Sequence, residues 1–159
     1  MIAVIGVGSP FGADQMGWQV IDALQRSELP ISNSGMPVTL FKLDRPGSGI
    51  VDQMQNASAA ILIDAVNSPD AEEKEIVVLS ADQLLQSSEH THRPLVSSHG
   101  FGLLQAIQLA EKLNLMPDKT SIVGMNILFN QDGLTEAEGL SDQEIGSLAD
   151  KVTQIIVTL

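Results

Sequence analysis

Apolar and polar positions along the chain form blocks that favour strands and helices in turn. Short apolar runs, which are typical of buried strands, occupy residues 2–7, 38–43, 59–66, 75–80 and 120–127. Apolar residues at a spacing of three or four predict helices over residues 16–27, 47–58, 81–88, 100–114 and 141–159. Strands that alternate with helices predict an α/β three-layer sandwich, with a mostly parallel five-stranded sheet and helices on both faces.

The fourth apolar run differs from the others in how it is connected. Only the short polar link at residues 67–74 separates it from the third run. A parallel neighbour needs a crossover connection of a dozen or more residues, usually a helix. We therefore expect the strand at 75–80 to be antiparallel and to lie at an edge of the sheet.

Length, charge and cysteine content narrow the class of protein. We expect residues 1–159 to form one domain, because 159 residues are enough to bury a sizeable core. A net charge of −12 without a basic patch argues against binding to nucleic acid or anionic membranes. The chain has no cysteine, which excludes disulfides and thiolate sites. The N-terminal apolar run is too short for a signal peptide and no run is long enough for a membrane span, so we expect a cytoplasmic protein.

The stretch GVGSPFGADQMG, residues 6–17, has the outline of a nucleotide-binding loop. Its glycines at Gly6, Gly8 and Gly12 are one residue out of register with the dinucleotide pattern G-x-G-x-x-G. Asp44, the acid that ends the second strand, also lies too far along the chain for the ribose. No Gly-Lys-Ser/Thr follows, so the P-loop pattern fails as well. We expect no bound nucleotide here.

Polar residues at the ends of the predicted strands indicate a site of another kind. In parallel sheets, ligands bind beyond the carboxyl ends of the strands. Asp14 follows the first strand, Asp44 ends the second and Asp64 interrupts the third apolar run, while His99 begins the helix after a polar loop. Each could instead be a helix cap or a loop hydrogen-bonding partner. Together, two carboxylates and an imidazole from Asp14, Asp64 and His99 predict a metal site with positions left open for water or substrate.

Five segments resemble, in their order and spacing, the maturation endopeptidases of nickel-iron hydrogenases. These segments are GVGSPFGADQMG, ILIDAV, SSHGFGLLQAI, IVGMNI and GLSDQEI. The resemblance implies a hydrolase that cleaves a C-terminal extension from the hydrogenase large-subunit precursor after nickel insertion. It also implies that nickel, supplied by the substrate, is the recognition element. The metal-binding and catalytic residues of the family fall on Asp14, Asp64 and His99.

The first loop departs from the family pattern by one residue. When the loop is aligned with the family pattern from Gly17, Asp14 falls on the ligand position. When it is aligned from Gly8, Gln15 falls there instead. We prefer Asp14, because a neutral amide is a poor nickel ligand.

The loop after the second strand departs further. Where the family often has Asp-Gly-Gly-Thr, this chain has Asp-Arg-Pro-Gly-Ser-Gly. We expect Asp44, Arg45, Gly47 and Ser48 to line the cleft and to select the precursor.

Two alternatives stay open at this point. One is a related peptidase or accessory protein that acts on another metalloprotein. The other is a receiver-like signalling module, which would need an acid pair after the first strand and a lysine after the last; residues 6–8 and 124–126 supply neither. For the peptidase we expect a monomer, with the precursor as its partner.

Overall fold

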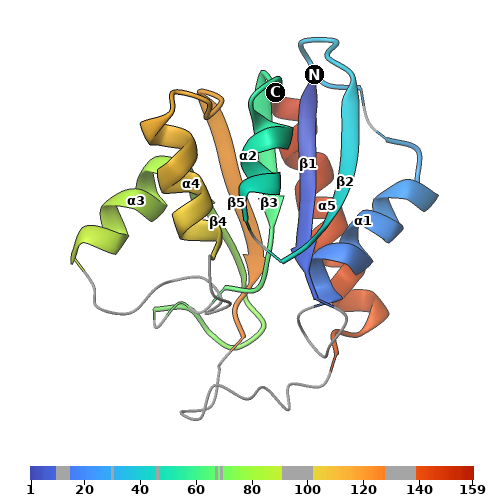
Figure 1. Ribbon diagram of the computed structural model, residues 1–159. Coiled ribbons are helices and arrows are strands. Elements are labelled where there is room, and N and C mark those ends of the chain that lie inside the picture. The colour runs from blue at the N-terminus through green and yellow to red at the C-terminus, as the bar shows by residue number, and fades with distance from the viewer. Residues whose placement is uncertain are drawn as a thin grey trace.

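The structure is a computed structural model. It describes residues 1–9, 15–29, 31–45, 47–66, 68, 70–90, 102–127 and 139–159. Within them, a five-stranded sheet forms the middle layer, with the strand order β2-β1-β3-β5-β4 (Figure 1). Its strands are β1 (Ile2–Gly8), β2 (Val38–Asp44), β3 (Ala59–Ile63), β4 (Ile76–Ser80) and β5 (Lys119–Met125).

Four of these strands run parallel, and their carboxyl ends lie at the lower edge of the sheet in Figure 1. Gly8 pairs with Asp44 at the ends of β1 and β2. Ile63, the last residue of β3, pairs with Gly6 on one side and with Val123 on the other. We call this edge of the sheet, where β1, β2, β3 and β5 end, the carboxyl edge. β4 pairs antiparallel with β5 at the end of the sheet, which confirms the prediction for the fourth strand.

Helices cover both faces of the sheet, as predicted (Figure 1). One face carries α1 (Met16–Arg26) and α5 (Asp142–Thr158), which pack on each other. The other carries α2 (Ser48–Met54), α3 (Ala81–His90) and α4 (Leu103–Lys112). Alternate side chains of β1 and β3 point into two separate apolar cores, one under each helix layer. Every residue of β3 is buried, which agrees with its uninterrupted apolar run.

Close glycine contacts seat the start of α1 directly on the sheet. A Cβ atom on Gly17 would lie 2.2 Å from the carbonyl oxygen of Val7 and 2.7 Å from that of Ile63. A Cβ atom on Gly6 would lie 2.3 Å from the carbonyl oxygen of Gly17. The first turn of α1 therefore rests on the backbones of β1 and β3, an approach that only glycine allows.

The third strand is shorter than the apolar run 59–66 predicts. β3 ends at Ile63, and beyond it only an isolated bridge between Val66 and Asn126 continues the pairing. The pattern alone could not show this, because residues 64–66 remain buried after the ladder is interrupted.

Helix boundaries also differ where the fold overrides the local pattern. The helix predicted over 47–58 ends at Met54, because Ser58 already donates its N–H to the carbonyl of Met1 beside the sheet, at 2.9 Å. In the other direction, α3 extends to His90, two residues beyond the prediction. The helix predicted over 100–114 ends at Lys112, and Asn114 just beyond it has φ of 53°, in the left-handed region.

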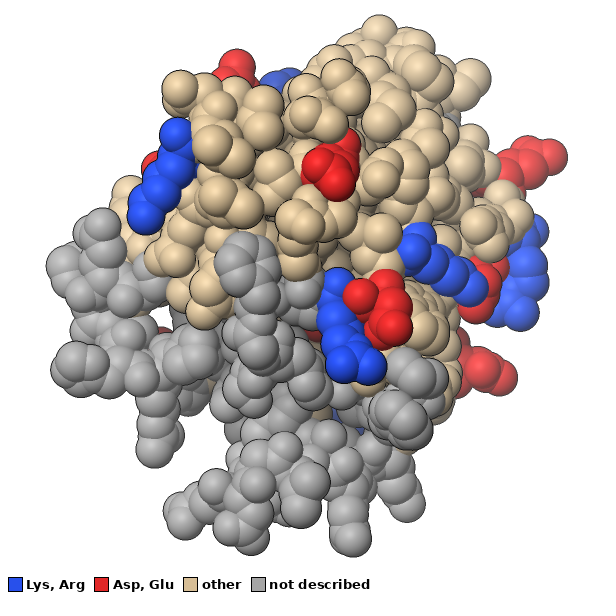
Figure 2. Space-filling model, in the orientation of Figure 1, with Lys and Arg blue, Asp and Glu red and all other residues tan. Residues whose placement is uncertain are grey.

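The charged side chains do not collect into a patch of one sign on the face shown in Figure 2. Ion pairs in the described residues include Lys42 with Asp22, and Lys74 with Glu144 at 3.0 Å. Within the described residues, no helix combines the length and the apolar character that crossing a bilayer requires.

Candidate functional site

Asp64 lies at the carboxyl edge, as its place in the sequence predicts. It is the first residue after the central strand β3 and is 5% exposed. Its backbone N–H donates to the carbonyl of Val123 at 3.3 Å, and its Oδ1 accepts the N–H of Ala65 at 2.8 Å. The buried carboxylate is thus held close to its own main chain, next to the end of β5.

The other two residues of the predicted metal site, Asp14 and His99, lie outside the described residues. Gln15, the alternative first-loop ligand, is the half-buried residue directly before α1. Among the described residues, no three His, Cys, Asp or Glu side chains are grouped so that they could hold a metal ion.

The predicted selection loop begins at the same edge. The N–H of Arg45 donates to the carbonyl of Gly8 at 2.7 Å, which extends the β1–β2 pairing by one bond. Arg45 has φ of 61°, in the left-handed region that non-glycine residues rarely adopt. Its guanidinium is exposed and lies 3.5 Å from the carboxylate of Asp44. Gly47 is the N-cap residue of α2, and Ser48 is the first residue of that helix.

Trp18 adds a contact that the sequence pattern did not single out. Its indole N–H on α1 donates to the carbonyl of Leu43 at 2.9 Å, near the end of β2. The first turns of α1 are thereby fixed to β2 as well as to β1 and β3.

Asn126 is a buried polar residue at this edge that the sequence analysis did not single out. It directly follows β5 and is fully buried. Its side chain bonds the main chain of Ser68, Ala71 and Glu72, which belong to the connection between β3 and β4. A polar residue near the end of the last apolar run is visible in the sequence, as Asp64 is, but the run does not show which distant residues it binds.

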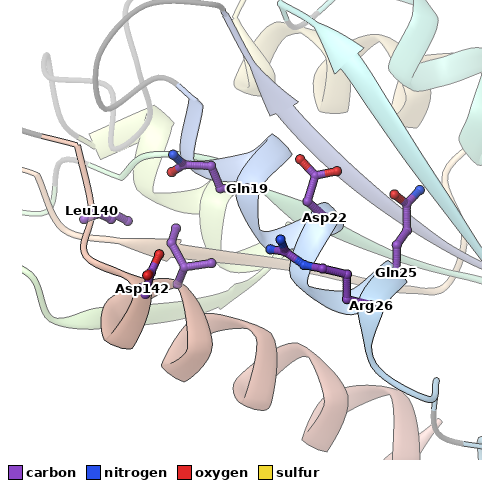
Figure 3. Close-up of a pocket in the computed structure, with 7 residues that line it drawn as sticks. Gln19, Asp22, Gln25, Arg26, Leu140 and Asp142 are labelled. Carbon is purple, nitrogen blue, oxygen red and sulfur yellow. The ribbon is translucent and has the colours of Figure 1, made fainter.

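A groove of about 320 Å³ lies between α1 and the start of α5, and Asp64 is not among the residues that line it (Figure 3). Figure 3 shows Gln19, Asp22, Gln25 and Arg26 along α1, and Leu140 and Asp142 at the start of α5. Asp22 is already paired with Lys42. None of the described residues that line this groove belongs to the predicted metal site or to the selection loop.

Comparison with known proteins identifies the fold. No protein-family model matches the sequence, and no curated protein matches it. Solved structures match along nearly the whole chain. An endopeptidase from Escherichia coli superposes with a TM-score of 0.70 at 20% identity, covering 98% of this chain and 88% of that one.

Two further structures carry more specific descriptions. The hydrogenase maturating endopeptidase HybD from E. coli has a TM-score of 0.68 at 20% identity, with 98% of this chain and 88% of that one covered. The [NiFe] hydrogenase maturation protease HycI from Thermococcus kodakarensis has a TM-score of 0.60 at 19% identity, with 98% and 89% covered. The chain therefore has the fold of hydrogenase maturation proteases, which confirms at the level of the fold the resemblance found in the sequence.

Proposed function

We propose that this protein is an endopeptidase that removes the C-terminal extension of a [NiFe] hydrogenase large-subunit precursor after nickel insertion. The observation that carries the proposal is the position of Asp64, a buried carboxylate directly after the central strand of this fold. The same proposal includes a cytoplasmic protein that acts as a monomer.

The ligand set of the proposal is Asp14, Asp64 and His99, which would hold the nickel of the precursor. The described residues support part of this set through connectivity. Gly17 contacts the carbonyl of Ile63, the residue before Asp64, and Asp14 precedes Gly17 by only three residues. Carboxylate and imidazole ligands suit a borderline ion such as Ni²⁺, with positions left open for other ligands.

The chemistry follows from where the nickel of the substrate would be held. Binding of that ion by the three ligands would fix the neighbouring peptide bond in place. A metal ion positioned there can polarise a carbonyl or lower the pKa of a bound water. A carboxylate of Asp14 or Asp64 that is not fully engaged can then accept the proton of the attacking water.

The sheet topology bears on the signalling alternative. Receiver-type folds have the parallel order 2-1-3-4-5, whereas this sheet has β5 beside β3 and an antiparallel β4 at its edge. The topology therefore favours the peptidase over the receiver module.

The test uses purified large-subunit precursor from the same genome, with and without nickel inserted, and follows the size shift on a gel. We expect cleavage of the nickel-loaded form only. Asp64→Asn and His99→Ala should each lower the rate roughly a hundredfold, because a misplaced reacting group costs about that much. Asp52→Asn, on an exposed position of α2, is the matched control and should cleave normally.

Two results would contradict the proposal. Equal cleavage of the nickel-free precursor would exclude nickel as the anchor. Full activity in Asp64→Asn would remove Asp64 from the site.

A further inference from the structure

We infer that Asn126 is a positioning residue: it fixes the connection that begins with Asp64, and through it the carboxylate of Asp64. We call residues 64–75 the β3–β4 connection. The inference rests on the proposed function for the role of Asp64, and on hydrogen bonds for the role of Asn126.

The side-chain amide of Asn126 bonds three residues of the β3–β4 connection. Its Oδ1 accepts the N–H of Ser68 at 2.7 Å. Its Nδ2 donates toward the carbonyls of Ala71 at 2.8 Å, Ser68 at 3.1 Å and Glu72 at 3.1 Å. Because Asn126 is fully buried, water cannot replace these partners if the side chain is changed. Only an amide presents an acceptor and two donors in this arrangement.

The main chain of Asn126 and its neighbours holds the same connection from both ends. The N–H of Lys74 donates to the carbonyl of Asn126, and the N–H of Asn126 donates to the carbonyl of Glu75, both at 2.7 Å. Toward Asp64, the N–H of Ile127 donates to the carbonyl of Val66 at 2.8 Å. The connection is therefore fastened to the end of β5 both near Asp64 and just before β4.

Little freedom remains for Asp64 between these bonds. One residue, Ala65, separates it from Val66, and the N–H of Ala65 binds its carboxylate. On the side of β5, a Cβ atom on Gly124 would lie 2.3 Å from the carbonyl oxygen of Asp64. The main chain of Asp64 thus lies directly on Gly124, two residues before Asn126.

The exposed ion pair of the β3–β4 connection is too weak to hold that connection in place. Lys74 pairs with Glu144 of α5 at 3.0 Å, beside a groove of about 370 Å³, but the lysine side chain is 53% exposed. Exposed ion pairs contribute little to holding a segment in place. The buried amide of Asn126 is the anchor.

The test compares Asn126→Asp, which keeps the volume but removes both donors, with Thr120→Val as the matched control. Thr120 is a buried residue at the opposite end of β5, and its hydroxyl donates to the carbonyl of Pro117 at 2.8 Å. Asn126→Ser serves in the same way should Asn126→Asp fail to fold.

Two measurements distinguish a positioning role of Asn126 from a general contribution to the stability of the fold. Hydrogen exchange at the amides of Ala65 and Val66 should accelerate about tenfold or more in the Asn126 variant, and stay unchanged in Thr120→Val. Cleavage of nickel-loaded precursor should fall about tenfold or more, with no further loss when Asn126→Asp is added to Asp64→Asn.

Unchanged exchange at these amides would overturn the inference. So would a cleavage loss that adds fully to that of Asp64→Asn, since Asn126 would then act independently of Asp64. If the wild-type protein cleaves no precursor, the proposed function fails, and the exchange result still decides whether Asn126 holds the segment that carries Asp64.

Discussion

Glu144 stabilises the start of α5 through three contacts. Its backbone N–H donates to the hydroxyl of Ser141 at 3.2 Å, and its carboxylate accepts the N–H of Ser141 at 2.8 Å, so that the two residues form a capping box. The carboxylate also pairs with Lys74. The backbone N–H of Ser141, and next Lys74, hold the pKa of Glu144 below its ordinary value of 4.5.

A group whose pKa is lowered on folding stabilises the protein at higher pH. The contribution of Glu144 is present above pH 4.5 and is lost as the pH falls through its folded-state pKa. Glu144→Gln keeps an acceptor for Ser141 but loses the charge. We expect its Tm to be slightly below that of the wild type at about pH 7, with the difference vanishing in acid once the pH is below the folded-state pKa of Glu144. Melting curves across this range, with the exposed Glu73→Gln as control, test this; a pH-independent difference would contradict it.

At the residue scale, the sequence identified Asp64 because a carboxylate that ends an apolar run is conspicuous. Asn126 was overlooked because an uncharged amide at the end of a strand looks like an ordinary strand residue. Its importance depends on partners at residues 68–72, more than fifty positions earlier in the chain. No local pattern contains that information.

Among the elements, α1 shows how a backbone contact can set the place of a helix. We expect Gly17→Ala to destabilise the protein by about 3 kcal/mol or to prevent folding, because the new methyl group would meet main-chain atoms of β1 and β3 that cannot move aside. Gly146→Ala is the control. Gly146 lies within α5, and outside its own helix backbone no atom of the described residues lies within 4 Å of an added Cβ, so alanine should stabilise the helix by about 0.5–1 kcal/mol.

Urea denaturation of both variants measures these differences. A Gly17→Ala variant as stable as the wild type would show that α1 can shift away from the sheet.

The sequence stretch around Gly17 predicted a helix start correctly, since Met16, Val20 and Leu24 form its buried side. The close approach was not predictable, because periodicity describes which side is buried and not how near the backbones lie.

For the whole molecule, the apolar pattern predicted most of the architecture. Five strands, helices on both faces and the antiparallel edge strand are confirmed. The spatial order β2-β1-β3-β5-β4 was not predicted, since it depends on which strands pair across long connections. The same applies to the proposed metal site: the pattern locates Asp64 at a strand end, whereas Asp14 and His99 come from segments with no periodicity to constrain them.

At the scale of the whole molecule, we predict that the loop after β2 determines which precursor the protein cleaves. Replacing Arg45-Pro46 by Gly-Gly should leave the fold intact, because glycine adopts the left-handed φ of 61° at position 45 without strain. It also removes an exposed cation from the carboxyl edge. We expect the ratio of cleavage rates between two nickel-loaded precursors to change by about tenfold or more, since specificity is a difference of binding free energies. Asn114→Gly, which relaxes a φ of 53° beyond the end of α4, is the matched control and should leave the ratio unchanged. Identical ratios in both variants would show that the loop only connects β2 to α2.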